Sequence, residues 1–253
     1  MTEYNHVLIT GASSGIGEAL AIYYAKNGTN LLSLCGRNEE RLNKTADECQ
    51  KLGAKVDVKI VDVADKAEVE AWVKSANDKM PLNLVFANAG VATLEETSEN
   101  VLRTFNINVM GVVNTVLPVI ELFKKAPADQ MKHIAITSSI AGYHGMPTCP
   151  SYSATKAGVK AWGEGLRLSL APLGIRVSTI CPGFIRSRIT DKNTCPMPYF
   201  METDKAVEII AKRIEKNVGL IAFPWQMRFA TWIASILPNC VSDFIYSKLP
   251  YKV

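Results

Sequence analysis

Residues 6–17 read HVLITGASSGIG, a short and mostly apolar run followed at once by a glycine-rich loop. The run predicts a buried strand at 6–10, and the residues after the loop have the apolar spacing of a helix. Gly11 permits a tight turn, Gly15 permits backbone to approach a pyrophosphate, and Gly17 permits close packing of helix on sheet. The loop therefore predicts a dinucleotide site at the helix N-terminus; a glycine-rich turn without a ligand is the alternative.

The rest of the chain repeats this alternation of short apolar runs and longer amphipathic stretches. Strands are expected at 6–10, 31–35, 56–61, 82–87, 133–137, 176–180 and 219–223, and helices at 16–27, 39–52, 66–79, 98–123 and 152–171. Strands that are apolar throughout are typical of a sheet covered on both faces. Without a repeat or linker, residues 1–253 are expected to form one α/β domain: a doubly wound, Rossmann-type parallel sheet with helices on both faces.

Composition limits the classes of function. Hydrophobic residues make up 48% and charged residues 21% of the chain, and mean hydropathy is +0.08, as in globular proteins. A net charge of +4 without a dense basic stripe predicts no nucleic-acid partner. Scattered cysteines favour free thiols in a reducing compartment, and the histidines have no metal-ligand spacing. With no signal-like N-terminus and no apolar run of about 18 residues, we expect a cytoplasmic protein.

The residues after the second expected strand bear on the choice of cofactor. They read Leu34-Cys35-Gly36-Arg37-Asn38, with an arginine and no carboxylate. A carboxylate at this point would bind a ribose 2′-hydroxyl, whereas an arginine accommodates a 2′-phosphate. The sequence thus favours NADP(H) over NAD(H), which stays an alternative, as does a solvated role for Arg37.

Tyr152 and Lys156 lie four residues apart at the start of an expected helix, and so on one helix face. A phenol with a pKa near 10 is a poor acid-base catalyst at neutral pH. A neighbouring ammonium, together with an oxidised nicotinamide ring, would favour the phenolate and bring the pKa toward the working range. The pair alone is a weak signal, because this spacing is common on helix surfaces.

Several motifs in a fixed order give the chain a family resemblance. They are TGASSGIG at 10–17, Asn88-Ala89-Gly90, Ser139, YSATK at 152–156 and Pro182-Gly183. In this order and spacing the chain resembles the short-chain dehydrogenase/reductase family, in its shorter single-domain branch, to about residue 190. The resemblance implies an NAD(P)-dependent oxidoreductase that interconverts a carbonyl and an alcohol by hydride transfer, with Tyr152 as general acid/base.

The resemblance also implies a role for each matching position. Its catalytic residues are Asn108, which holds a water of a proton relay, Ser139, which binds the substrate oxygen, Tyr152 and Lys156. Its cofactor-binding residues are Gly11, Ser13, Ser14, Gly15, Ile16, Gly17, Arg37, Asp62 (at the adenine), Val63, Asn88, Ala89, Gly90, Tyr152, Lys156 (at the nicotinamide ribose), Pro182, Gly183, Ile185 and Ser187.

Two positions depart from the family pattern. Ser187 replaces a usual threonine, and Ser14 replaces a basic residue of many NADP-using members, which leaves Arg37 as the main 2′-phosphate partner.

Two segments near the C-terminus concern substrate and partners. Residues 184–203 are expected to form a flap over a small-molecule carbonyl or alcohol, which apolar surroundings suggest is hydrophobic. Further candidates for the pocket wall are Tyr143, His144, Met146 and Trp225. For the apolar segment 224–250, a helix that closes the core is favoured over a substrate lid, a subunit interface or a membrane-surface contact. The resemblance implies a homodimer or homotetramer, commonly packed through the helices of Asn108 and Tyr152.

Two other functions stay open. One is a cofactor-binding regulatory or scaffolding protein of the same fold with little catalysis, since fold alone does not imply function. Against it, every catalytic position holds a competent residue. The other is an epimerase or dehydratase acting on a nucleotide sugar, although such relatives have longer chains with more substrate-binding sequence.

Overall fold

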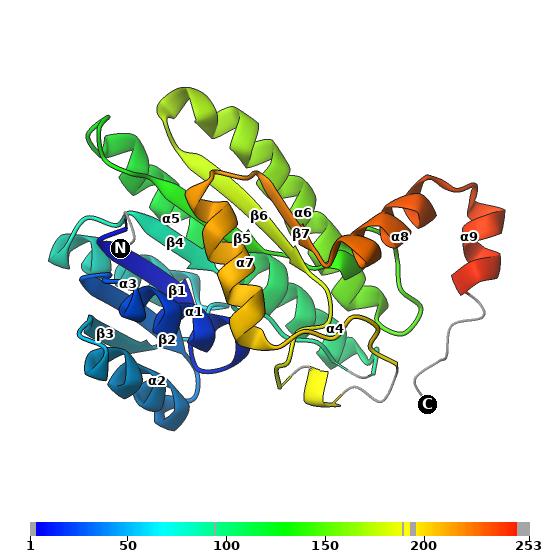
Figure 1. Ribbon diagram of the computed structural model, residues 1–253, viewed down its shortest axis with the longest axis horizontal. Coiled ribbons are helices and arrows are strands. Elements are labelled where there is room, and N and C mark those ends of the chain that lie inside the picture. The colour runs from blue at the N-terminus through cyan, green and yellow to red at the C-terminus, as the bar shows by residue number, and fades with distance from the viewer. Residues whose placement is uncertain (1–3, 94, 189, 193–195, 247–253) are drawn as a thin grey trace.

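A computed structural model describes residues 4–93, 95–188, 190–192 and 196–246. Within these residues the strands form one parallel sheet in the order β3-β2-β1-β4-β5-β6-β7 (Figure 1). They are β1 (His6–Thr10), β2 (Leu31–Gly36), β3 (Lys55–Ile60), β4 (Leu84–Ala87), β5 (His133–Thr137), β6 (Arg176–Pro182) and β7 (Leu220–Phe223). The order reverses between β1 and β4, where doubly wound sheets bind ligands beyond the carboxyl ends of their strands. The predicted fold class is confirmed.

Helices cover both faces of the sheet (Figure 1). One face carries α1 (Gly15–Lys26), α2 (Glu39–Lys51) and α7 (Thr203–Glu215); the other carries α3 (Lys66–Lys79), α5 (Gly111–Lys125) and α6 (Pro150–Leu170). Helix α4 (Ser98–Phe105) packs on α6. Short turns of 3-10 helix are η2 (Ile140–Gly142), η3 (Ala171–Leu173) and η4 (Thr190–Lys192). Because successive side chains of a strand point to opposite faces, Leu8 and Ile9 of β1 belong to two separate apolar clusters.

The longest helical path, Ser98–Lys125, joins α4, a π-helical turn η1 (Asn106–Met110) and α5. Among the described residues it is the one helix long and apolar enough to cross a membrane, with an 18-residue window of mean hydropathy 1.4. Half of that window is buried inside the protein, where α5 packs on α3 and β4. We therefore interpret it as a core helix. Single π-turns inside α-helices are frequent at functional sites.

Every strand and helix expected from the pattern is present, with small shifts at the ends. Side-chain caps mark several helix starts: Asn38 accepts a hydrogen bond from the Arg41 N–H, and Asp65 accepts one from the Glu68 N–H. Helix α7 was not expected, although its buried apolar residues recur at helical spacing.

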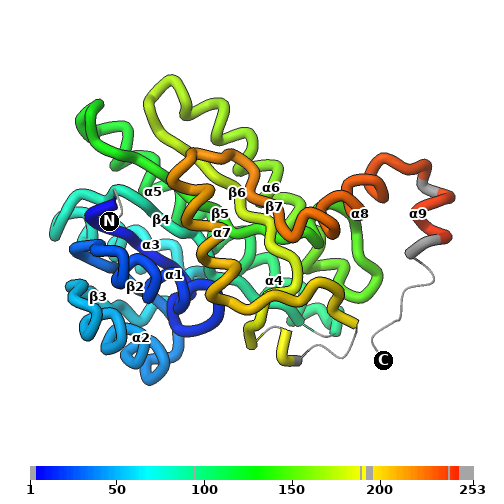
Figure 2. Tube along the Cα trace, in the orientation of Figure 1, coloured from blue at the N-terminus to red at the C-terminus, as the bar shows by residue number. Residues whose placement is uncertain are grey.

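The C-terminal segment forms α8 (Trp225–Ile236) and α9 (Asn239–Tyr246), which extend away from the sheet (Figures 1 and 2). Helix α8 contacts β7 and η2 but buries none of its residues. Trp225, Phe229, Trp232 and Ile236 are 71%, 54%, 49% and 61% exposed. The prediction that segment 224–250 closes the core is therefore wrong for this helix. The sheet beside it is already covered by α6 and α7, and residues 247–250 lie outside the described residues.

Candidate active site

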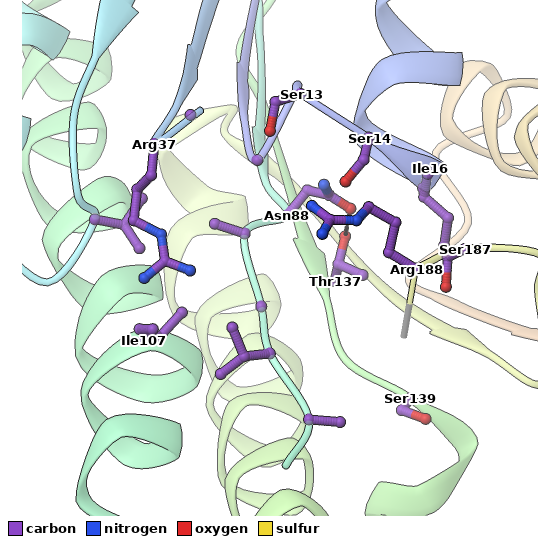
Figure 3. A pocket seen from close by; sticks show the side chains of 18 of the residues that line it. Ser13, Ser14, Ile16, Arg37, Asn88, Ile107, Thr137, Ser139, Ser187 and Arg188 are labelled. Atoms are coloured by element: carbon purple, nitrogen blue, oxygen red, sulfur yellow. Dashed lines mark hydrogen bonds between the residues drawn. The ribbon is translucent and has the colours of Figure 1, made fainter. Parts of the chain in front are cut away.

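A cavity of about 480 Å³ opens at the carboxyl ends of β1, β2, β4, β5 and β6. Its lining includes every predicted cofactor-binding residue except Gly17, and every predicted catalytic residue except Asn108. In Figure 3, Arg37 and Ser139 lie at opposite ends of the cavity. The reversal of strand order falls between them, which is where open α/β sheets bind nucleotides.

The glycines of the loop after β1 have backbone conformations or close neighbours that a residue with a side chain could not accommodate. Gly11 and Gly15 have φ of +70° and +58°. A Cβ at Gly11 would lie 2.8 Å from the Ala89 Cα, and one at Gly17 would overlap the Gly11 carbonyl oxygen. Gly17 thus lets α1 approach the loop from behind the cavity, so that the N–H groups at the start of α1 remain open to it.

A network of hydrogen bonds holds the ends of β1, β4 and β5 together beneath the cavity. The Thr10 hydroxyl accepts hydrogen bonds from the Asn88 and Ala89 N–H groups, at 2.9 and 3.1 Å. The Asn88 side chain donates to the Thr10 carbonyl at 3.1 Å and accepts from the Thr137 hydroxyl at 3.2 Å. The loop at 88–90 is therefore fixed to three strands, as a rigid floor for a ligand requires.

One end of the cavity is rich in arginine. Arg37 makes an ion pair with Asp62 at 3.5 Å, and both side chains are nearly half exposed. Arg41, in the first turn of α2, lines the same cavity, and its buried Nε has no hydrogen-bond partner among the described residues. Sequence reasoning missed Arg41, although it stands four residues after Arg37.

Two further arginines, Arg103 and Arg188, also line the cavity and were missed. In Figure 3, the side chain of Arg188 extends beside Asn88 and Ser14, in the middle of the cavity. Its position next to Ser187, which was predicted to bind the cofactor, was the available signal. The cavity is therefore more basic than the predicted residues alone indicated.

At the other end, α6 presents Tyr152 and Lys156 to the cavity. The Lys156 Nζ lies 5.7 Å from the centre of the Tyr152 ring and donates a 3.0 Å hydrogen bond to the Thr137 carbonyl. Burial lowers the pKa of Lys156 to about 8. Burial raises the pKa of Tyr152 to about 12, and a hydrogen bond with the Ser139 hydroxyl acts in the opposite direction. Tyr152 is thus a neutral phenol at pH 7, able to donate a proton.

The two serines after β5 have different surroundings. The Ser138 hydroxyl donates a 2.6 Å hydrogen bond to the Lys156 carbonyl and so faces the backbone of α6. The Ser139 hydroxyl accepts from the Ala141 N–H at 3.1 Å and lines the cavity near Tyr152. This geometry supports Ser139, rather than Ser138, as the residue that meets a substrate oxygen.

Asn108 lies in η1, fully buried and just outside the cavity. Its side chain accepts a hydrogen bond from the Val91 N–H at 2.8 Å and donates to the Val91 carbonyl and the Thr155 hydroxyl. A Cβ at Gly90 would lie 3.3 Å from both the Asn108 Oδ1 and the Lys156 Nζ, so both side chains approach that glycine closely. The role of Asn108 in a proton relay stays a prediction.

The expected flap at 184–203 is closed at its base. The Arg186 N–H donates to the Met201 carbonyl and the Met201 N–H to the Phe184 carbonyl, both at 3.0 Å. Residues 189 and 193–195 lie outside the described residues, and the motion of the flap stays a prediction. The four further wall candidates do not line this cavity: Tyr143, His144, Met146 and Trp225.

Comparison with known proteins gives the same family that the sequence motifs indicate. Residues 5–196 match the short chain dehydrogenase family. The chain is 34% identical over 245 residues to an uncharacterized oxidoreductase of Myxococcus xanthus, covering 95% of each chain. It is 28% identical to estradiol 17-beta-dehydrogenase 11 of Rattus norvegicus, covering 97% of this chain and 84% of that one.

Among solved structures, a short-chain dehydrogenase from Sphingobium yanoikuyae in complex with NADPH superposes with a TM-score of 0.80 at 26% identity. The match covers 97% of this chain and 96% of that one. Motifs, fold and relatives therefore agree: the chain belongs to the short-chain dehydrogenase/reductase family and is an oxidoreductase.

Proposed function

We propose that the protein interconverts a carbonyl and an alcohol with NADP(H), and that Tyr152 transfers the proton. The observation that carries this proposal is the grouping of Tyr152 and Lys156 with Ser139, which lies at the end of the cavity opposite Arg37 (Figure 3). That arrangement gives a dinucleotide room to extend from an arginine-rich end to a proton donor. The bound nicotinamide supplies the hydride, and the protein supplies position and proton transfer.

Each polar group of the catalytic end has a definite task in reduction. The Ser139 hydroxyl binds the carbonyl oxygen and stabilises the negative charge that develops on it. Tyr152 gives that oxygen its phenolic proton. The Lys156 ammonium, held by the Thr137 carbonyl, favours the resulting phenolate and is placed to bind ribose hydroxyls. In alcohol oxidation the same proton moves back to Tyr152.

The arginine-rich end supports a preference for NADP(H). The Nε of Arg41, which lacks a hydrogen-bond partner among the described residues, and the guanidinium of Arg37 offer donors that a 2′-phosphate would satisfy. Releasing Arg37 from Asp62 costs little, because ion pairs this exposed contribute about 0–1 kcal/mol. The NADPH complex of the Sphingobium relative is consistent with this preference.

For the substrate we propose a hydrophobic carbonyl or alcohol. Apolar side chains of Val91, Ile107 and Ile185 line the cavity, and Met227 lies against Gly183, where an added Cβ would approach its Sδ to 2.9 Å. The name of the Rattus norvegicus relative, estradiol 17-beta-dehydrogenase 11, is that of an enzyme acting on a steroid. A scaffolding role, the second candidate, would need no such lining.

The test measures oxidation of NADPH and of NADH with a panel of apolar and small polar carbonyls. We expect NADPH to be preferred and apolar carbonyls to be reduced. The double variant Arg37→Ala/Arg41→Ala should lower the NADPH:NADH ratio of kcat/KM by about 100-fold or more, since hydrogen bonds to charged groups contribute about 1.5–3 kcal/mol each. Lys44→Ala, an exposed substitution on α2, is the matched control. Absence of turnover with every carbonyl would favour the scaffolding protein, and an equal rate with NADH would contradict the cofactor preference.

We further propose that the protein self-associates through α4 and α5. Leu102, Phe105 and Leu117 on these helices are 65%, 40% and 48% exposed, which is unusual for side chains of this size in one region. Light scattering of Leu102→Glu/Leu117→Glu beside wild type should show a smaller mass for the variant. An unchanged mass would contradict the proposed interface.

A further inference from the structure

Helix α8 carries a stripe of large apolar side chains that faces away from the protein. Trp225, Phe229, Trp232 and Ile236 recur at intervals of four, three and four residues, and therefore lie on one helical face. All four are exposed. Met227 lies on the opposite face and packs against the small apolar cluster of Ile140, Cys181 and Ala222. The orientation of the stripe is thus fixed by the packing of α8 on the body of the protein.

Two further exposed aromatic side chains lie near the start of α8. Tyr199 and Phe200 are 55% and 39% exposed and border a shallow hollow that also touches Pro224 and Gln226 at the start of α8. We call the four stripe residues, Tyr199 and Phe200 the α8 surface. In both ribbon and tube views α8 and α9 extend from one side of the body, so that α8 can meet a large flat partner without obstruction from the sheet (Figures 1 and 2).

The charges around the α8 surface are mainly positive. Arg228 is the charged residue of α8, and Lys205 borders the hollow. Within the described helices α8 and α9, Arg228 is the basic residue and Asp243 the acidic one. Glu202, which also borders the hollow, is already neutralised by Arg186 at 2.8 Å. The surroundings are therefore complementary to an anionic partner.

Aromatic and aliphatic side chains on one helical face, with basic residues beside them, are typical of helices that lie in the interface of a bilayer. Tryptophan is enriched at that depth because it has an apolar ring and a polar N–H. A second copy of the chain is a weaker candidate, because α4 and α5 offer a separate apolar face for self-association. Spanning is excluded by length, since α8 has 12 residues and a span needs about 20.

We propose that the α8 surface binds the surface of an anionic phospholipid bilayer, with α8 lying in the plane of the membrane. Because α8 packs on η2, directly after Ser139, docking brings the catalytic end of the cavity close to the lipid. An apolar carbonyl dissolved in the bilayer would then be near its site. This consequence rests on the proposed function, whereas the docking itself does not.

The experiment is flotation of the full-length protein with phosphatidylcholine vesicles, with and without phosphatidylglycerol. Wild type is expected to bind the anionic vesicles at least about 10-fold more tightly than the neutral ones. High salt should weaken the binding to anionic vesicles, and binding should shift the tryptophan emission to the blue. The variant Phe229→Ser/Trp232→Ser/Ile236→Ser should lose this binding by about 10-fold or more, because it removes three apolar side chains that the bilayer would bury. Leu52→Ser/Ile60→Ser/Leu173→Ser, which removes three exposed apolar side chains outside α4, α5 and α8, is the matched control and should bind as wild type does.

A single variant, Arg228→Glu, guards against misfolding of the triple variant and should weaken binding to anionic vesicles alone. Failure of wild type to float, or equal flotation of the α8 variant, would overturn the proposal. The proposal would also be overturned if wild type were a dimer that does not bind vesicles and the α8 variant were a monomer. A second copy of the chain would then cover the α8 surface. Vesicle binding without any carbonyl reduction would support the membrane docking of the α8 surface and would contradict the proposed enzymatic function.

Discussion

The nucleotide side of the sheet and the C-terminal helices place the same kind of side chain in opposite environments. Ile9, Leu34 and Phe86 are fully buried, and the polar strand ends beside them are hydrogen-bonded to one another. The apolar residues of α8 are exposed instead. The difference indicates two uses of apolar surface: burial fixes the geometry of a reaction site, while outward exposure leaves a surface free for an external partner.

Among the variants that compare the buried site with the exposed helix α8, the largest effect is expected for the buried residue Lys156, in the variant Lys156→Met. Turnover should fall by about 10³-fold, within the range of general acid–base contributions. The free energy of unfolding at pH 7 should nevertheless rise by about 2 kcal/mol. Holding a lysine at a pKa of about 8, rather than near 10.4, costs roughly 3 kcal/mol, from which the lost hydrogen bond to Thr137 subtracts about 1.

The sign of this effect can be checked with pH. The unfolded chain binds more protons than the folded one between about pH 8 and 10, so wild type gains stability over that range and the variant does not. Chemical denaturation of both proteins at pH 7 and pH 10 measures the difference. A variant less stable than wild type at pH 7 would show that the buried charge is not a source of strain.

A second effect concerns a buried histidine in the sheet. His133 bonds the Tyr4 hydroxyl and the Ser178 hydroxyl at 3.0 and 2.9 Å, and burial lowers its pKa to about 3. As the pH falls below about 6.5, this histidine takes up a proton in the unfolded chain but not in the folded one. The free energy of unfolding therefore falls as the pH drops from about 6.5 toward 3, and at pH 4.5 the loss is roughly 3 kcal/mol. His133→Gln should flatten this loss. Parallel curves for the two proteins between pH 6.5 and 4.5 would contradict it.

A smaller effect is expected where a loop holds the catalytic helix. The exposed Glu96 carboxylate accepts hydrogen bonds from the Ser151 N–H at 3.1 Å and its hydroxyl at 2.8 Å, directly before Tyr152. Glu96→Ala should lower kcat by about 10-fold, or 1.4 kcal/mol in the barrier, with NADPH affinity unchanged. Glu96→Gln keeps an acceptor and should retain most of the rate. Equal rates for the two variants would assign Glu96 no part in positioning.

The smallest effect is expected for the exposed apolar residues of α8. Without vesicles, Phe229→Ser/Trp232→Ser/Ile236→Ser should change the free energy of unfolding by within about 0.5 kcal/mol for each site, as surface substitutions do. Ile9→Ala in β1 should cost about 2–5 kcal/mol. Denaturant titrations of the two variants sharpen the contrast. A large loss for the α8 variant would mean that this helix does support the core.

The fold and most of the cavity could be predicted, because β1 and its loop are local features with strict steric requirements. Gly11 and Gly17 are needed wherever this turn and this close packing occur, and the other strands repeat the same apolar pattern. The roles assigned to the cavity residues stay predictions, but their proximity follows from the order of motifs along a parallel sheet.

The parts that sequence reasoning missed depend on tertiary position. Arg41 and Arg188 reach the cavity from α2 and from the loop after β6, and nothing in their immediate neighbours requires that direction. The outward face of α8 was predicted only as an alternative to core closure, because an apolar helical stripe predicts burial without saying against what. Its exposure follows from the coverage of the sheet by α6 and α7.

The central claim, that Tyr152 is the proton donor of a hydride-transfer site, is tested most directly by a single-turnover measurement. Wild type and Tyr152→Phe are each mixed with saturating NADPH and a reducible carbonyl, and NADPH affinity is measured separately by fluorescence. We predict a rate lowered by about 10³-fold or more, with an affinity for NADPH within about threefold of wild type. A variant that keeps a tenth or more of the wild-type rate would contradict the claim.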